Sequence, residues 1–108
     1  MRFLVITRPR PTQLPPDAIV AMLTAARDWL KEQQAKGEIE VLYGFPEGGG
    51  VAIVNTPSHE ALNAAVQQYP LYPMTDWSIF PLCDVEQAIE LGIKLTNERA
   101  AMSGARAA

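Results

Sequence analysis

The segment Tyr69–Trp77 constrains the fold of this chain most strongly, because it combines two prolines with aromatic neighbours. A proline fixes its own φ near about −65° and shifts the residue before it away from helical conformation. Pro70 therefore ends the helix-like run before it and holds Tyr69 and Tyr72 in place ahead of the strand-like run 78–82. Such a stiff, apolar connection predicts one wall of a pocket or of a subunit interface.

Hydrophobic periodicity predicts the other elements of the chain. Strands are expected at residues 2–8, 38–44, 51–55 and 76–82, and helices at 15–37, at 56–69 and from about 85. Thr56 is the expected cap of the second helix, and Ile89 and Ile93 of the third are expected to face inward. The order β-α-β-β-α-β with an added C-terminal helix is the ferredoxin-like, α+β pattern. We expect one domain over residues 1–99 and a flexible tail over 100–108.

Three of the expected strands carry apolar side chains on both faces, although the helices of this fold cover only one face. The residues on opposite faces are Phe3/Val5 and Leu4/Ile6, Ala52/Val54 and Val51/Ile53, and Trp77/Ile79 and Phe80/Leu82. Left uncovered, the second face would expose several hundred Å2 of apolar surface, more than a soluble monomer usually tolerates. The sequence therefore predicts a two-fold symmetric homodimer in which the two sheets form an α+β barrel.

Charge and composition argue against several classes of partner. The net charge is −3 and the pI is about 5.0, whereas nucleic-acid binding needs a basic face. No apolar run approaches the roughly 18 residues of a membrane span, and the start is charged too early for a signal peptide, so a cytoplasmic location is expected. A single cysteine, Cys83, and a single histidine, His59, argue against an internal disulfide and a zinc site.

The segment Tyr69–Pro73, with Leu62 before it and Asp76 after it, resembles the muconolactone isomerase family. Members carry a leucine-proline-leucine-aromatic-proline run between the second helix and the fourth strand. Residues Thr56–Leu62 are also similar to the start of their second helix, and the similarity covers roughly residues 1–84. The resemblance implies a dimeric α+β barrel that often assembles into larger rings, with a pocket that a neighbouring subunit completes. It also implies a cofactor-free proton shift that moves a double bond in a small lactone acid, or loss of chloride from chlorinated lactones.

The chain departs from this family at the residues expected to carry chemistry. The founding enzymes have an acidic pair in the middle of the first helix, and counting back from Gly37 places Ala25 and Ala26 there. The basic and histidine side chains that they carry on the first two strands are not reproduced. The resemblance therefore implies the scaffold, and other residues must supply any catalysis.

Three residues are candidates for moving a proton next to a carbonyl, which needs a base in reach and a group that holds the enolate charge. Asp76 opens the fourth strand beside the proline–aromatic segment, where it either faces the pocket or bonds the turn backbone. Asp28 is the acid nearest to Ala25 and Ala26, but it is out of phase with the buried positions. His59 has the only side chain that ordinarily titrates near neutral pH, at a helix start that is usually solvated.

The candidates for ligand binding are one arginine and a group of aromatic residues. Arg8 could clamp a carboxylate in bidentate fashion, or instead form a surface pair with Glu47 or Asp76. Aromatic side chains with polar tips could line a pocket, or belong to the core or the subunit interface. These are Tyr43, Tyr69, Tyr72 and Trp77, together with Phe45.

Two hypotheses of function follow from these residues. The first is a cofactor-free isomerase or lyase acting on a small lactone or carboxylic acid in a pocket that a second subunit completes. The second is a non-catalytic protein on the same barrel that binds a small apolar acid or simply assembles. A haem-degrading or monooxygenase module is a weaker third hypothesis, since the only histidine lies at a helix start.

Overall fold

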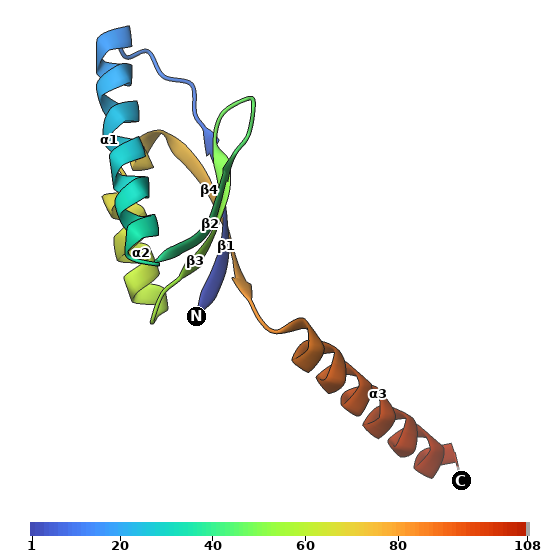
Figure 1. Cartoon of the computed structure of the whole chain (residues 1–108). Helices are drawn as coiled ribbons and strands as arrows, with labels where there is room; N and C mark the ends of the chain where they lie inside the picture. Colours follow the sequence, from blue (N-terminus) through green and yellow to red (C-terminus); the bar gives the residue numbers. More distant parts are fainter. Residues whose placement is uncertain (108) are drawn as a thin grey trace.

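A four-stranded antiparallel sheet carries two helices on one of its faces in the computed structural model, which describes residues 1–107 (Figure 1). The strands are β1 (Arg2–Pro9), β2 (Ile39–Gly44), β3 (Gly50–Asn55) and β4 (Thr75–Leu82). The helices are α1 (Pro16–Ala35), α2 (His59–Gln68) and α3 (Val85–Ala107), with a short 3-10 turn η1 (Tyr72–Met74). The strand order β2-β3-β1-β4 and the element order confirm the predicted ferredoxin-like α+β fold with an added C-terminal helix.

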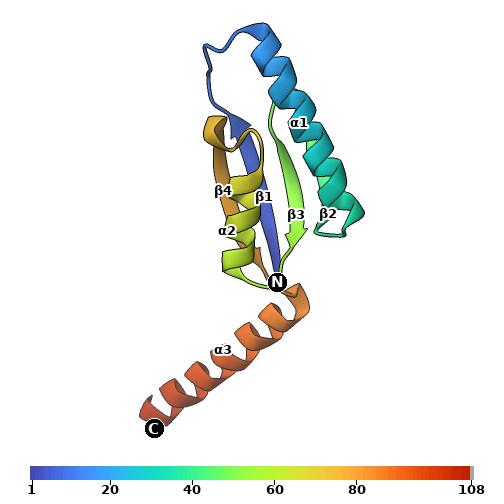
Figure 2. The ribbon, with the colours of Figure 1, turned by 90° about the vertical axis from the view of Figure 1, so that its left-hand side faces the viewer.

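The core lies between the sheet and the helices α1 and α2, which Figure 2 shows side by side in front of the strands. Alternation along β1 places Phe3 and Val5 on this side, where both are almost fully buried. The rest of the buried apolar cluster is Ile39, Ala52 and Leu62. Each of these side chains except Ala52 contributes roughly 1.5–3 kcal/mol on burial. This core is small for a chain of this length, because one face of the sheet and the whole of α3 lie outside it.

The ends of α1 follow the sequence signals. Pro15 and Pro16 begin the helix, Asp17 lies in its first turn, and Gly37 ends it in the left-handed region at φ +76°. Ala26 is buried as its place in the apolar stripe predicts, whereas Leu23 of the same stripe is 53% exposed.

The start of α2 corrects the prediction that Thr56 is its cap. Ser58 takes this role, and its Oγ accepts a hydrogen bond from the Ala61 N–H at 3.1 Å. Thr56 is buried instead. Its N–H donates to the Met1 carbonyl at 2.8 Å and its hydroxyl donates to the Ser58 carbonyl at 2.9 Å. A contact with the chain start therefore decides where this helix begins.

The third helix does not pack where the sequence predicts. Figure 1 shows α3 projecting away from the body, and Ile89 and Ile93, expected to face inward, are 58% and 57% exposed. The helix continues to Ala107, so the residues expected to form a flexible tail are helical up to that point, and residue 108 lies outside the described part. The boundary after residue 99 stays a prediction. Within residues 1–107, the structure has no helix that combines the length and apolar character needed to cross a bilayer.

The turn between β2 and β3 is held against β1 by glycine. The Phe45 N–H donates to the Gly49 carbonyl at 2.9 Å, and Gly49 adopts φ +76°. A Cβ at Gly49 would overlap the carbonyl oxygen of Thr7. This position therefore needs glycine for two reasons, its backbone conformation and the close approach of β1.

The effects of backbone conformation and of close approach can be separated by substituting Gly49 and, as a control, Gly37. Gly37 has the same φ but open space where a Cβ would lie. We expect Gly37→Ala to lower the free energy of unfolding by about 1–2 kcal/mol through backbone strain alone. Gly49→Ala should cost about 2–4 kcal/mol, because the overlap with Thr7 is added. Urea denaturation followed by circular dichroism measures both. Equal losses would show that the turn moves away from β1 at little cost.

Candidate functional site

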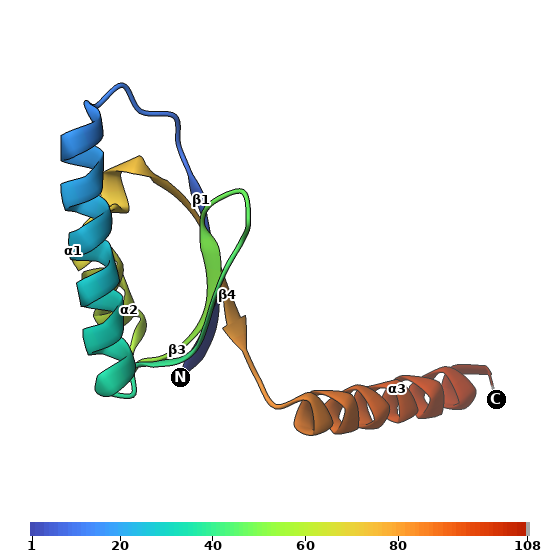
Figure 3. The same cartoon turned by 45° about the horizontal axis from the view of Figure 1, so that its top comes forward.

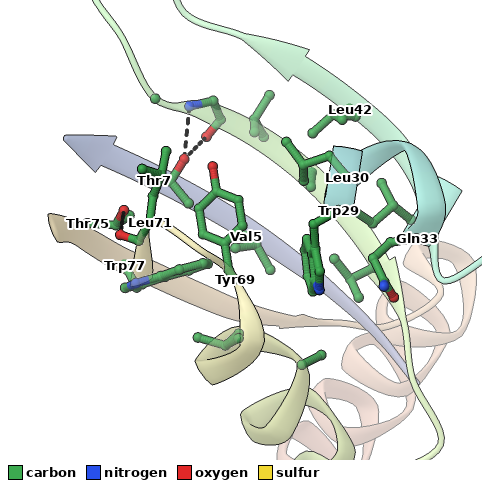
Figure 4. Close-up of a pocket in the computed structure, with 18 of the residues that line it drawn as sticks. Val5, Thr7, Trp29, Leu30, Gln33, Leu42, Tyr69, Leu71, Thr75 and Trp77 are labelled. Atoms are coloured by element: carbon green, nitrogen blue, oxygen red, sulfur yellow. Dashed lines mark hydrogen bonds between the residues drawn. The ribbon is translucent and has the colours of Figure 1, made fainter. Parts of the chain in front are cut away.

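A cavity of about 570 Å3 lies between the helix-facing side of the sheet and the helices α1 and α2 (Figure 4). Its size is that of a typical small-molecule site. Apolar side chains from the strands and both helices supply most of its wall, among them Val5, Leu30, Leu42, Leu62 and Val66. The small residues Ala52, Ala61 and Ala65 also line it, from β3 and α2.

Three aromatic rings form a continuous row along this cavity. The ring centroids of Trp29 and Tyr69 are 5.5 Å apart, and those of Tyr69 and Trp77 are 5.6 Å apart at an interplanar angle of 85°. All three residues line the cavity, and Figure 4 shows Tyr69 between the two indoles. Tyr72 lies further out, with its ring 6.1 Å from that of Trp77. The proline–aromatic segment thus provides one wall of the cavity.

Apart from Arg8, Arg10 and Glu38, the polar side chains among the described lining residues are neutral. Gln33 of α1 is buried among its lining residues. The Thr7 hydroxyl accepts from the Gly50 N–H at 3.0 Å and faces Tyr69 across the space in Figure 4. The indole Nε1 of Trp77 is buried and finds no hydrogen-bond partner among the described residues. An unpaired buried N–H costs about 1–3 kcal/mol.

Burial raises the pKa of the Tyr69 phenol above its ordinary value. The phenol therefore stays protonated at neutral pH and acts as a hydrogen-bond donor rather than as a base. A neutral donor in an apolar cavity is suited to holding a carbonyl or enolate oxygen.

Two arginines mark the mouth of the cavity. Arg8 and Arg10 both belong to its lining. The Arg8 Nη1 lies 3.3 Å from Glu47 Oε1 with its guanidinium over the Phe45 ring, and the Arg10 Nε lies 2.7 Å from Asp76 Oδ1. Both pairs are largely exposed, so each contributes no more than about 1 kcal/mol and a ligand carboxylate can displace the acid.

The three candidate catalytic residues do not come together, and none lines this cavity. Asp28 is exposed and pairs with Arg27 at 3.1 Å. His59 packs edge-on against the Phe3 ring at 5.3 Å, outside the cavity. Asp76 stands opposite Arg8 in the sheet register, on the face away from the helices, although its neighbour Trp77 points into the cavity.

The aromatic candidates for ligand binding lie partly inside the cavity and partly outside it. Tyr69 and Trp77 line the cavity, and Tyr72 lies in a smaller recess beside it with Arg10 and Trp77. Tyr43 stands opposite Val51, on the face away from the helices, and is 70% exposed at the rim. The only carboxylate among the described lining residues is that of Glu38, at the end of the cavity near Asn55. Residues 1–107 contain no cluster of three or more His, Cys, Asp or Glu side chains that could hold a metal ion.

Sequence reasoning missed several residues that face the cavity. Trp29 and Gln33 follow Ala26 and Leu30 at helical spacing, so a polar residue in an apolar stripe was the available signal. Arg10 was passed over in favour of Arg8, although the two flank the same proline.

Comparisons with known proteins agree with this architecture. The sequence model of the muconolactone delta-isomerase family matches residues 1–88. A muconolactone isomerase crystal structure is similar with a TM-score of 0.72 and 23% identity, over 78% of this chain and 90% of that one. A 5-chloro-2-hydroxyhydroquinone dehydrochlorinase from Burkholderia phenoliruptrix AC1100, in complex with 2,5-dihydroxybenzoquinone, is similar with a TM-score of 0.61 and 17% identity, over 81% and 98%. At these identities the two structures show the fold alone. No curated protein matches the chain in sequence.

The raised pKa of Tyr69 has a measurable consequence. The difference in tyrosinate absorbance between the wild type and Tyr69→Phe reports the ionisation of Tyr69. We expect this difference to develop only above the ordinary tyrosine pKa of about 10. Because the neutral phenol is favoured in the folded state, its contribution to stability is complete below that pH and falls as pH rises through the folded pKa. Urea denaturation at pH 9 and pH 11 should therefore show a steeper loss for the wild type than for Tyr69→Phe. A difference absorbance that develops at or below pH 10 would contradict this.

Proposed function

The chain belongs to the muconolactone delta-isomerase family, and on this basis we propose that its cavity binds a small unsaturated lactone or carboxylic acid. We further propose that the chain shifts a double bond in this ligand by moving a proton, without a metal or an organic cofactor. A second copy of the chain completes the site. The observation that supports this proposal best is an apolar cavity with neutral donors inside and two arginines at its mouth.

The polarity of the cavity suggests how such a ligand is oriented. Its carboxylate lies at the mouth near Arg10, with Arg8 close by, because these are the only cationic residues among the described lining residues. Its flat ring lies against Tyr69 and Trp77. The Tyr69 hydroxyl then donates to the lactone or enolate oxygen.

Asp76 is the best supported proton carrier of the three sequence candidates. It bonds to Arg10 at the mouth, whereas Asp28 and His59 lie on the outside of the helices and at the end of the core. Its face of the sheet is the one on which the second copy is expected. A copy seated there would cover the Asp76 carboxylate, which reaches the bound ligand only at the mouth, through its bond to Arg10.

A non-catalytic binding protein is the second candidate function. The observation that favours it is the shortage of bases, since Glu38 is the single carboxylate and no histidine is found among the described lining residues. The positions of the family's acidic pair fall on Ala25 and Ala26, neither of which lines the cavity. On this alternative the chain binds the same class of acid and releases it unchanged.

Binding can be followed through the two tryptophans of the chain, because Trp29 and Trp77 both line the cavity. We expect an unsaturated five-membered lactone acid to change their fluorescence on titration. Arg10→Gln should weaken binding, raising the Kd about 5- to 30-fold, through loss of a charge-assisted hydrogen bond of roughly 1–2 kcal/mol. Arg27→Gln, an exposed arginine remote from the cavity, is the matched control and should leave the Kd unchanged. Equal changes in the Kd for the two variants would contradict the proposed orientation of the ligand.

Catalysis is tested separately from binding. Incubation of the bound lactone acid in deuterated buffer should exchange the hydrogen next to its carbonyl and produce the shifted isomer, as proton NMR can show. Asp76→Asn should lower the exchange rate by at least about 100-fold, because a general base contributes about 10²–10⁴ in rate, while the Kd should not rise, because Asp76 competes with the ligand carboxylate for Arg10. Binding without exchange or isomer in the wild type would instead establish the non-catalytic alternative.

A further inference from the structure

The single chain is far less compact than a globular protein of its size. Its radius of gyration is 20.3 Å, whereas about 13 Å is typical for about 100 residues. Its accessible surface is 7905 Å2, against about 5,900 Å2 for a compact monomer of this mass. The excess of about 2,000 Å2 exceeds the roughly 800 Å2 that each partner buries in a standard interface. This surface belongs chiefly to α3 and to the face of the sheet that α1 and α2 leave bare.

The residues of α3 divide into an apolar and a polar side. With about 3.6 residues per turn, the apolar residues fall on one broad arc of the helix. This apolar arc consists of Val85, Ala88, Ile89, Leu91, Gly92, Ile93, Leu95 and Met102, and past Leu95 it also contains Thr96, Arg99 and Ser103. The opposite polar arc consists of Glu86, Gln87, Glu90, Lys94, Asn97 and Glu98. The large side chains of the apolar arc are between 39% and 67% exposed, so the chain itself gives them no cover.

The bare face of the sheet carries a second set of apolar side chains. Alternation along the strands places them opposite the buried Phe3 and Val5. They are Leu4, Ile6, Val41, Val51, Ile53, Phe80 and Leu82. Figures 1 and 3 show that α3 projects from this same side of the sheet, away from α1 and α2. A molecule that covers the bare face therefore lies beside α3.

The start of α3 is ordered by hydrogen bonds to Asp84. Only Cys83 and Asp84 separate it from the end of β4, and Asp84 Oδ2 accepts a hydrogen bond from the Gln87 N–H at 2.9 Å. The Ala88 N–H also donates to the Asp84 carbonyl at 3.0 Å, which begins the helix immediately. These hydrogen bonds order the short connection between β4 and α3.

We propose that α3 is an exchanged arm whose apolar arc packs against a second copy of this chain, the copy whose sheet covers the bare face. By two-fold symmetry each copy gives one arm and receives one. The arm is continuous with the expected sheet interface, and it lies almost wholly beyond the part that the family model matches, residues 1–88. This proposal depends on self-association through the bare face and not on the ligand that the cavity binds.

A lipid surface fits α3 less well than a second copy does. Helices that lie on membranes carry lysine and arginine on their polar side. Here the polar arc carries three glutamates, at 86, 90 and 98, and the single cation Lys94. Gly92 and Ala88 within the apolar arc allow close approach of another protein surface, since the space around Gly92 is open.

Three glutamine substitutions in the full-length chain test the arm. Ile89→Gln and Leu95→Gln polarise the apolar arc, and Glu90→Gln is the matched control on the polar arc. Analytical ultracentrifugation should show dimer dissociation constants at least about tenfold higher for the first two variants and an unchanged value for Glu90→Gln. Dissociation constants that match the wild type for all three would overturn the proposal. Because lactone binding is measured apart, failure of the arm and failure of the proposed function are distinguishable.

Amide hydrogen exchange tells which molecule covers the arm. We expect the amides of α3 to exchange fast at concentrations where the chain is monomeric and to be protected where it is dimeric, because an isolated helix of this length is marginal in water. Equal protection at both concentrations would indicate docking on the same chain, and fast exchange at both would indicate no docking; each overturns the proposal. So would protection that appears only with vesicles of phosphatidylcholine and phosphatidylserine.

Discussion

The structure depends on one unequal arrangement, a sheet that is apolar on both faces but covered by helices on only one. Phe3 and Val5 lie under α1 and α2, while Leu4 and Ile6 on the same strand face the other way, with no helix over them, and are only half-buried. Hydrophobic burial is the main driving force of folding, so a chain built in this manner is incomplete when it is alone. The small core, the long surface of α3 and the mouth of the cavity at the edge of the bare face all follow from this arrangement.

Local signals made most of the fold predictable, and long-range contacts account for the differences. Strand and helix periodicity, together with Gly37 and Pro70, gave the order of elements and nearly all of their ends. Thr56 is not the cap because the helix begins two residues later, after Ser58, and Thr56 is instead bonded to the carbonyl of Met1, a contact that no local pattern contains. The apolar arc of α3 shows in sequence that the helix needs burial. It does not show where the covering surface lies, and an inward direction for Ile89 was therefore wrong.

The candidate site was predictable where the proline–aromatic segment governs it and much less so elsewhere. Tyr69 and Trp77 line the cavity because the segment places them on the helix-facing side of the sheet. Asp76 precedes Trp77 directly, so the alternation of a strand sends its carboxylate to the opposite face. Gln33 was missed because a glutamine on a helix is usually solvated. Only the assembled fold shows that it takes a position in the buried stripe.

The tight approach of Gly49 to Thr7 also limits how this scaffold can change over evolutionary time. A side chain at Gly49 would meet the backbone of β1, and one at Gly50 would meet the carbonyl of Tyr43 at 2.5 Å. The turn beside the cavity mouth is thus closed to variation, while Arg8 and Arg10 next to it are exposed and free to be exchanged. A descendant of this protein that acquired a new ligand would therefore be expected to keep its glycines and to replace its arginines.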